Sequence, residues 1–109
     1  MALAESCYRL TGSFPREETF GLASQIRRAA TSVPANIAEG HGRENTRMFV
    51  QHLRIAQGSL KELESHLLLS ELVGVAIQAT IERPMEQCDE LGKMLRSLIR
   101  SLQQKVAKP

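Results

Sequence analysis

Apolar residues between positions 49 and 67 recur at alternating steps of four and three residues. The members of this row are Phe49, Leu53, Ala56, Leu60, Leu63 and Leu67. A seven-residue repeat of this kind requires a helix, because helical geometry places all of its side chains on one stripe. Asn45 before the row and Gly74 after it are typical start and stop residues, which predicts a helix ending near Leu72 and about 40 Å long. Its stripe must be buried, so the chain is expected to fold by packing helices together.

Three further segments have helical apolar patterns: Ala2 to Leu10, about Glu17 to Glu39, and a last segment whose apolar rows extend from Ile81 to Val106. The main row of the last segment is Ile81, Cys88, Leu91, Leu95, Leu98 and Leu102, and a second row of Met85, Ile99 and Val106 widens it. The first segment begins in phase at its first residue and looks cut off at its start. Turns are expected at 11–16, 40–45 and 74–80, where Gly, Pro and polar residues gather.

Two prolines fall inside these helical patterns. Pro34 predicts a kink or a restart near Ser32, whose hydroxyl would cap the freed turn. Pro84 either lies in the first turn of the last helix or kinks a helix that begins near Ala76. Long helices joined by short turns predict an all-α fold, an antiparallel up-and-down four-helix bundle with a shortened first helix, as a single domain over residues 1–109.

Composition restricts the class of protein. With 42% hydrophobic residues, 109 residues can build one core but not two, and the net charge of +2 is too small to indicate a polyanion partner by itself. Cys7 and Cys88 are too few for a disulfide framework and fall in apolar helical patterns, so we expect reduced thiols in a cytoplasmic protein. We expect neither export nor membrane insertion, since there is no basic leader and no run of about eighteen apolar residues.

Basic residues form rows at helical spacing, away from the apolar stripes. Arg47, Arg54 and Lys61 are seven residues apart, and the carboxy-terminal residues 93–109 hold five basic residues and no acid, which suggests a basic tail. Each row alone is also what an ordinary solvated helix face carries. With only four aromatics, these rows support backbone-directed contacts with little sequence specificity. The candidate nucleic-acid contacts are Arg27, Arg28, Arg47, Arg54, Lys61, Lys93, Arg96 and Arg100.

Asn36 and Glu39 stand three residues apart beside Pro34. They could form a ligand-binding or catalytic pair. Alternatively, they bond the carbonyl freed by Pro34 and a neighbouring arginine, Arg43 or Arg47. We favour this structural interpretation, because capping and repair of a kink are common uses of such residues.

No pattern typical of an enzyme or a metal site is present. His52 and His66 lie fourteen residues apart, about 21 Å along a helix, and no HExxH, CxxC or G-x-S-x-G spacing occurs. The glycines at 40 and 42 lack the preceding strand and the Gly-Lys-Ser/Thr ending of a phosphate-binding loop. We therefore expect no catalytic residue, no metal and no cofactor.

Gly58 falls in mid-helix at an outward position. Glycine costs about 1 kcal/mol relative to alanine in such a place. This suggests that another subunit approaches closely there, and the alternative is a tolerated neutral change.

Four stretches resemble the "four helix bundle protein" family, first described as the protein encoded by the intervening sequence of bacterial 23S ribosomal RNA genes. They are QIRRAA at Gln25–Ala30, SVPANIAEG at Ser32–Gly40, GSLKELE at Gly58–Glu64 and LGKMLRSLI at Leu91–Ile99. The resemblance implies an up-and-down bundle, a homopentamer, no enzymatic activity, and structural roles for Ser32, Pro34, Asn36, Glu39, Gly40 and Gly58. Relatives include the accessory variability determinant of diversity-generating retroelements, for which the implied partners are a reverse transcriptase and nucleic acid, but this chain resembles the intervening-sequence branch more.

Two functions therefore remain open. The first is a non-enzymatic homo-oligomeric scaffold, a pentamer with a dimer as the fallback, that binds RNA or DNA backbone through basic helix faces. The alternative is a protein-binding oligomeric adaptor, for example for a polymerase, that presents the loops 11–16 and 40–45 and does not bind nucleic acid directly. Salt-dependent affinity for nucleic acid separates them, because phosphate contacts release counterions.

Overall fold

The computed structural model describes residues 2–107, which form helices and turns without a strand. The helices are α1 (Ala2–Gly12), α2 (Leu22–His41), α3 (Thr46–Leu72) and α4 (Gln78–Ala107), with a short 3-10 turn at Arg16–Glu18 between α1 and α2. Together they form an elongated body of 54 × 21 × 19 Å. The all-α bundle with a short first helix is confirmed. The stretch expected as a basic tail is the end of α4 as far as Ala107, and Lys108 lies outside the described residues.

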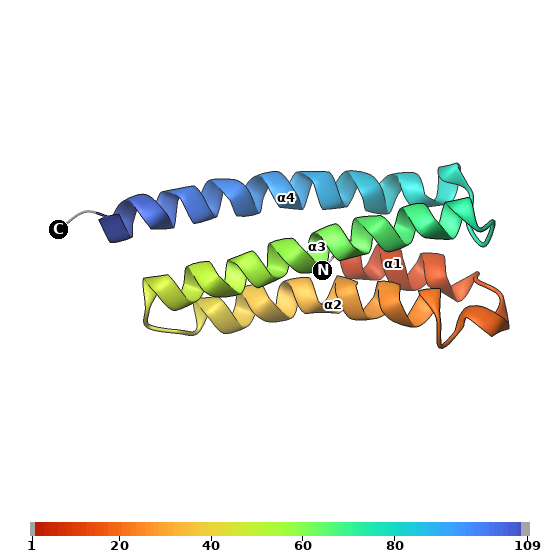
Figure 1. Ribbon diagram of the computed structural model, residues 1–109, viewed down its shortest axis with the longest axis horizontal. Helices are drawn as coiled ribbons and strands as arrows, with labels where there is room; N and C mark the ends of the chain where they lie inside the picture. The colour runs from red at the N-terminus through yellow and green to blue at the C-terminus, as the bar shows by residue number, and fades with distance from the viewer. Residues whose placement is uncertain (1, 108–109) are drawn as a thin grey trace.

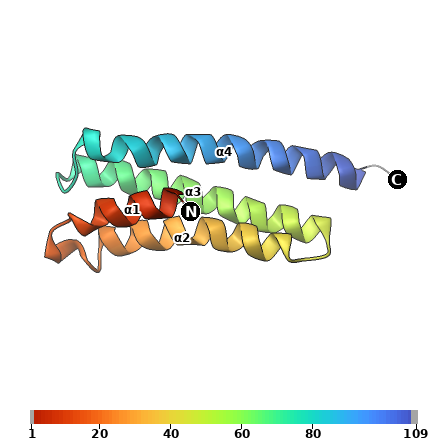
Figure 2. The ribbon, with the colours of Figure 1, turned by 180° about the vertical axis from the view of Figure 1, so that it is seen from behind.

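Consecutive helices run in opposite directions (Figure 1). Each helix packs against two of the other three. The helix α1 contacts α2 and α4, and α3 also contacts α2 and α4. Because α1 is only 11 residues long and α4 is 30, α1 lies beside one half of the bundle (Figure 2). The other half is built from α2, α3 and α4.

The apolar row of α3 forms the centre of the core, as predicted. Leu53, Ala56, Leu63 and Leu67 are fully buried, Leu60 is nearly so, and Phe49 packs half-buried against them. The predicted ends of α3 are also confirmed: the Asn45 side chain accepts a hydrogen bond from the Met48 N–H at 3.1 Å, and α3 ends at Leu72. Gly74 adopts a φ of +83°, the left-handed conformation that glycine tolerates after a helix.

The buried face of α4 differs from the prediction near its carboxy-terminal end. Leu98, placed in the main apolar row, is 37% exposed, whereas Ile99 of the second row is 5% exposed. The reason is that α1 is short. Past the level of Ala2, α4 still packs against α3, but none of the described helices covers the side of α4 that a longer α1 would have covered. The side chain that faces α3 is therefore buried instead of the one that would face α1.

The start of α2 was also predicted wrongly. The α-helix begins at Leu22, because Gly21 before it has φ −102° and ψ −113°, outside the helical region. The preceding residues form the 3-10 turn instead, and the Glu18 carboxylate accepts a 3.4 Å hydrogen bond from the Leu22 N–H. This contact satisfies one of the free N–H groups at the start of α2.

Both prolines lie inside continuous helices. α2 runs through Pro34 to His41, so the restart expected near Ser32 is wrong. Pro84 is buried well inside α4, which begins at Gln78, so the first-turn alternative is also wrong. Pro34 does remove the N–H that would bond the Ala30 carbonyl. The packing of α2 against α1 and α3 compensates for that lost bond.

Candidate functional site

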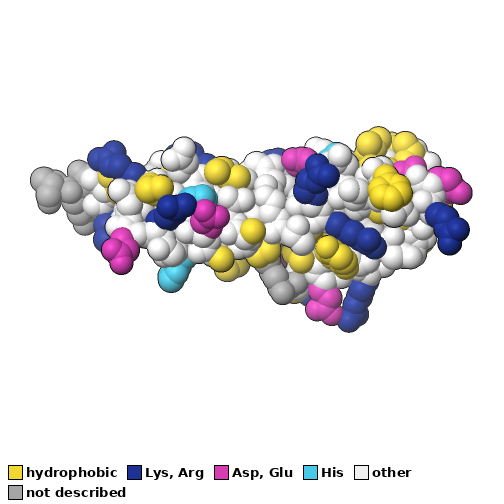
Figure 3. Space-filling model, turned by 90° about the horizontal axis from the view of Figure 1, so that it is seen from below, with side chains coloured by type: hydrophobic (Ala, Val, Ile, Leu, Met, Phe, Trp, Pro, Cys, Tyr) yellow, Lys and Arg dark blue, Asp and Glu magenta, His cyan; other side chains and the backbone are white. Residues whose placement is uncertain are grey.

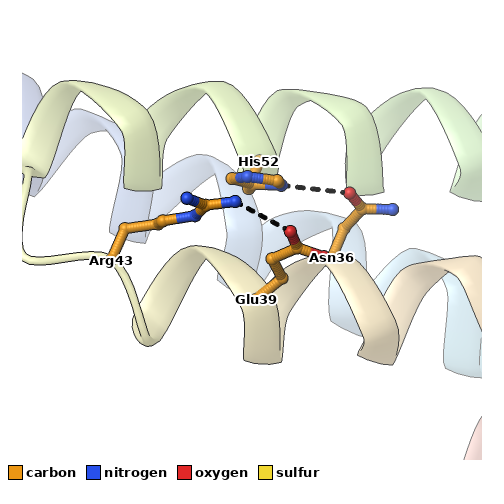
Figure 4. A network of polar contacts seen from close by, with 4 residues as sticks. All are labelled: Asn36, Glu39, Arg43 and His52. Carbon is orange, nitrogen blue, oxygen red and sulfur yellow. Dashed lines mark hydrogen bonds and ion pairs between the residues drawn. The ribbon is translucent and has the colours of Figure 1, made fainter.

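A chain of polar contacts joins α2 to α3 at the centre of the SVPANIAEG stretch. The Asn36 amide nitrogen donates to the Ser32 carbonyl at 2.9 Å and lies 3.1 Å from the Ser32 hydroxyl, which is itself 2.8 Å from the Ser59 hydroxyl. The Asn36 oxygen lies 3.2 Å from Nδ1 of His52 (Figure 4). Since the Asn36 nitrogen already serves as a donor, its oxygen must accept, and this assigns the proton to Nδ1 of His52.

These contacts correct the roles expected for Ser32 and Asn36. Asn36 bonds the Ser32 carbonyl and not that of Ala30, because a helical side chain points back by one turn and Ala30 lies six residues away. Ser32 does not cap a broken turn but bonds Ser59 across the helix interface. Both side chains therefore tie α2 to α3, which supports their structural interpretation.

Glu39 pairs with Arg43, one of the two arginines predicted for it. The two charged groups are 3.0 Å apart and lie on the surface at one side of this polar chain (Figure 4). Both side chains are about half exposed, so the pair contributes only a few tenths of a kcal/mol.

Gly40 lies where α2 approaches α3 closely. A Cβ atom at this position would lie 2.7 Å from Cβ of His52 and 3.0 Å from Cδ1 of Phe49. The sequence places Gly40 at the start of a turn, but the residue is buried inside α2. Its role depends on which residues of α3 stand opposite, and no local pattern reveals this.

Replacing Gly40 with alanine is expected to destabilise the fold by about 1–3 kcal/mol, because the new Cβ meets the backbone-attached Cβ of His52 and one of the helices must shift. Urea unfolding at a fixed protein concentration measures the change. Gly58→Ala is the matched control: a Cβ there meets nothing within 4 Å, so alanine should add up to about 1 kcal/mol of stability. Equal midpoints for Gly40→Ala and the unchanged chain would contradict the close approach.

A groove of about 500 Å³ lies between α3 and α4. Its walls are Arg54, Gln57, Gly58, Leu60, Lys61 and Glu64 from α3, and Cys88, Asp89, Gly92 and Arg96 from α4. A second, separate hollow of about 380 Å³ lies between the same two helices and is lined by Arg47, Val50, Gln103 and Val106. The two hollows place the Arg47 row of α3 and Arg96 of α4 along the same helix pair, which sequence spacing alone does not predict.

The acidic side chains of the groove lie beside lysines and not beside its arginines. Lys61 lies 3.8 Å from Glu64, and Lys93 lies 3.2 Å from Asp89, so both carboxylates of the groove already have a cationic neighbour. Among residues 2–107, no carboxylate lies within 4.0 Å of the guanidinium of Arg54 or Arg96. The groove is therefore a locally positive surface with two guanidinium groups available on opposite walls.

Two mid-helix glycines face this groove. Gly58 is exposed as predicted, with open space where its Cβ would be. At Gly92, a Cβ would lie 3.4 Å from a guanidinium nitrogen of Arg96 and 3.6 Å from Cδ2 of Leu60. Both distances at Gly92 are ordinary van der Waals contacts, and the packing of the chain gives no reason for glycine at 58.

The other predicted basic contacts are placed differently. Nε of Arg27 donates to the Thr11 hydroxyl at 2.7 Å, and its guanidinium lies 4.9 Å from the centre of the Tyr8 ring. Arg27 therefore ties α2 to α1 and is not part of the groove. The remaining predicted contacts are exposed outside the groove lining: Arg28 on α2, and Lys93 and Arg100 on α4.

Charges on the face that Figure 3 shows are mixed in sign along its length. Hydrophobic side chains gather there at the end where the α1–α2 and α3–α4 turns lie (Figures 1 and 3). Phe20, in the first of these turns, is 94% exposed, and Leu72 at the end of α3 is 81% exposed. The described residues of this face therefore offer no continuous basic surface.

The two thiols and the histidines do not form a reactive centre. Cys7 and Cys88 are free and fully buried, and burial raises the pKa of the Cys7 thiol to about 11 and that of Cys88 to about 12. Both thiols are therefore protonated near neutral pH and are poor nucleophiles and metal ligands. Within the described part of the chain, no three His, Cys, Asp or Glu side chains come together as metal ligands. None of the described helices is long and apolar enough to cross a membrane.

The fold and its surface define an up-and-down helical bundle with a basic groove along one helix pair. Residues 1–97 match the family model of the 23S rRNA-intervening sequence protein, and the chain belongs to this family. A crystal structure of a protein of unknown function from the S23 ribosomal protein family of Bacteroides thetaiotaomicron has the same fold, with a TM-score of 0.75 and 23% identity over 89% of this chain and 97% of the other. No curated protein matches the chain.

Proposed function

We propose that this protein is a non-enzymatic, homo-oligomeric scaffold that binds the sugar-phosphate backbone of RNA or DNA along the groove between α3 and α4. The observation that carries the proposal is the alignment of Arg47, Arg54 and Lys61 with Arg96 of the neighbouring helix. Phosphate contacts need several cations along a line and no fixed constellation of side chains, which is what this groove offers. The rRNA-related family is consistent with a nucleic-acid partner.

A second copy of the chain is proposed to cover an apolar face of α4. Ala2 and Leu3 at the start of α1 line a hollow with Leu91 and Met94, and from there α4 continues without α1 beside it. Met94 is 66% exposed and Leu98 is 37% exposed on this face. Exposed neighbouring apolar side chains are typical of surfaces that contact another protein. We propose a ring, with the pentamer resting on the family resemblance alone.

Sedimentation at micromolar concentration is expected to show a species several times heavier than the 12.1 kDa chain. Met94→Glu should shift it toward the single chain, because a charge buried in an interface without a partner is costly. Glu82→Gln, an exposed α4 position that does not line this hollow, serves as the control and should leave the mass unchanged. A 12.1 kDa species alone for the unchanged chain would contradict the oligomer.

Changing Arg47, Arg54 and Lys61 together to glutamine tests nucleic-acid binding. The variant loses three phosphate contacts, so its affinity for a labelled RNA hairpin at low salt should be weaker. The magnitude of the slope of log K against log salt should decrease by up to about 2.7. The row lies outside the core, so thermal unfolding should be unchanged. The control changes Arg9, Arg16 and Arg43 to glutamine, which removes the same charge from exposed positions outside both the groove and the proposed subunit interface.

Absence of binding by the unchanged oligomer, even at low salt, would leave the protein-binding adaptor as the better function. That alternative needs one revision. The turns at 11–16 and 40–45 lie at opposite ends of the bundle (Figure 1), so one partner could not contact both turns of a single subunit. The exposed apolar side chains at the end that holds Phe20 and Leu72 would then be the better docking surface.

A further inference from the structure

We propose that the groove at Gly58 and Gly92 is a seat for a single phosphate group, held between Arg54 on α3 and Arg96 on α4. The proposed function makes this group a phosphodiester of the bound nucleic acid, and the inference rests on that function for the identity of the polymer. The seat itself depends only on the shape and charge of the groove. It would fix the register of the backbone along α3 and α4, which a diffuse basic surface does not do.

Space for the phosphate comes from the glycines. A side chain at position 58 would project into the groove, and glycine leaves that volume open, with no atom within 4 Å of where a Cβ would stand. Glycine is unfavourable in the middle of a helix, and nothing inside the chain requires it at this position. An external group that enters the groove accounts for it.

Gly92 acts on the opposite wall. The Arg96 guanidinium lies over it, with one nitrogen 3.4 Å from the place of the absent Cβ. A Cβ there would only touch the guanidinium at van der Waals distance, whereas a side chain extending beyond Cβ would compete with it for this space. The two glycines therefore differ: Gly58 leaves the volume of the groove open, and Gly92 leaves room beside one of the cations that line it.

The charges favour a phosphate over a carboxylate. Arg54 and Arg96 approach from different helices, and neither has a carboxylate partner among the described residues. Each guanidinium presents a planar fork of donors. The oxygens of a tetrahedral phosphate group do not lie in one plane, so the group can accept hydrogen bonds from two guanidinium groups on opposite walls. A carboxylate has only two oxygens, which match the paired donors of a single guanidinium.

The lining groups indicate binding without covalent chemistry. Cys88 is buried at the groove and stays a protonated thiol near neutral pH. Glu64 and Asp89 each lie beside a lysine, at 3.8 and 3.2 Å, so their charge is largely offset. The groove is thus built to hold an anion and has no activated nucleophile to attack it.

Gly58→Leu is the decisive variant, because it fills the groove and leaves every charge in place. Its affinity for a labelled RNA hairpin should fall about tenfold, and its salt slope should fall by about 0.9, the values for one lost phosphate contact. Ser97→Leu adds the same side chain on an exposed position of α4 outside the groove lining and should change neither quantity. Circular dichroism verifies that both variants fold.

Arg96→Gln provides a second, independent test of the same seat. It should reproduce the loss seen for Gly58→Leu, and the double variant should be little weaker than either single one, since both remove the same contact. Arg100→Gln lies one turn further along α4, removes the same charge and should have a smaller effect. Additive losses in the double variant would overturn a shared seat.

A probe without a polymer separates the seat from the proposed function. Inorganic pyrophosphate added to the isotope-labelled protein should shift the amide signals of Gly58 and Gly92, and the Gly92 shift should be absent in Gly58→Leu. Pyrophosphate shifts without RNA binding would keep the seat and reject the polymer. If Gly58→Leu and Ser97→Leu bind RNA with equal affinity, nucleic-acid binding stands and the phosphate seat is rejected. If neither pyrophosphate nor RNA binds, both proposals are rejected.

Discussion

Replacing Leu63 with alanine is expected to lower the free energy of unfolding by about 2–5 kcal/mol, the range for removing a fully buried leucine side chain. Leu63 is 0% exposed and belongs to the apolar row of α3, the helix that packs against both α2 and α4. The lost transfer energy and the cavity left behind both contribute. Chemical unfolding at a fixed protein concentration measures the loss, because oligomerisation would otherwise change the apparent stability.

Leu72→Ala is the matched control, since it makes the same change at the end of the same helix. Leu72 is 81% exposed, so its truncation should alter stability by no more than about 0.5 kcal/mol. Equal losses for the two variants would contradict the orientation of α3 in the bundle. That orientation sets which side chains face the groove, so this measurement also tests the geometry on which the proposed binding depends.

The fold was predictable wherever local chemistry decides the structure. The seven-residue row of α3 and its Asn45 cap depend on residues a few positions apart, and both are confirmed. The errors occur where tertiary packing decides. The choice between Leu98 and Ile99 depends on where α1 ends beside α4, and the packing of α2 keeps Pro34 inside one helix.

The candidate site shows the same division. The Glu39–Arg43 pair follows from a four-residue spacing within one helix and was predicted. The hydrogen bond between Asn36 and His52 and the close approach at Gly40 require the register between α2 and α3, which a single sequence does not specify. The basic rows of α3 and α4 were recognised separately, but their meeting in one groove was not. The one overlooked signal is Gly92, a second mid-helix glycine beside a basic row.

Salt is expected to have the largest effect on the protein's binding, and its magnitude reports how many subunits bind one nucleic acid. The groove and the second hollow of each subunit together offer four cations, namely Arg47, Arg54, Lys61 and Arg96. If one groove binds four phosphates, the slope of log K against log salt is about −3.6, and affinity falls about 150-fold between about 50 and 200 mM salt.

Two grooves of an oligomer on the same molecule would neutralise eight phosphates. The slope then doubles to about −7.2, and the loss over the same salt range rises to about 2 × 10⁴-fold. At low salt the second groove also raises the affinity, because its binding becomes intramolecular once the first is engaged. Fluorescence anisotropy at several salt concentrations distinguishes the two slopes. Met94→Glu should convert the steeper slope to the shallower one if that face joins the subunits, whereas tight binding with a slope near zero would contradict backbone recognition altogether.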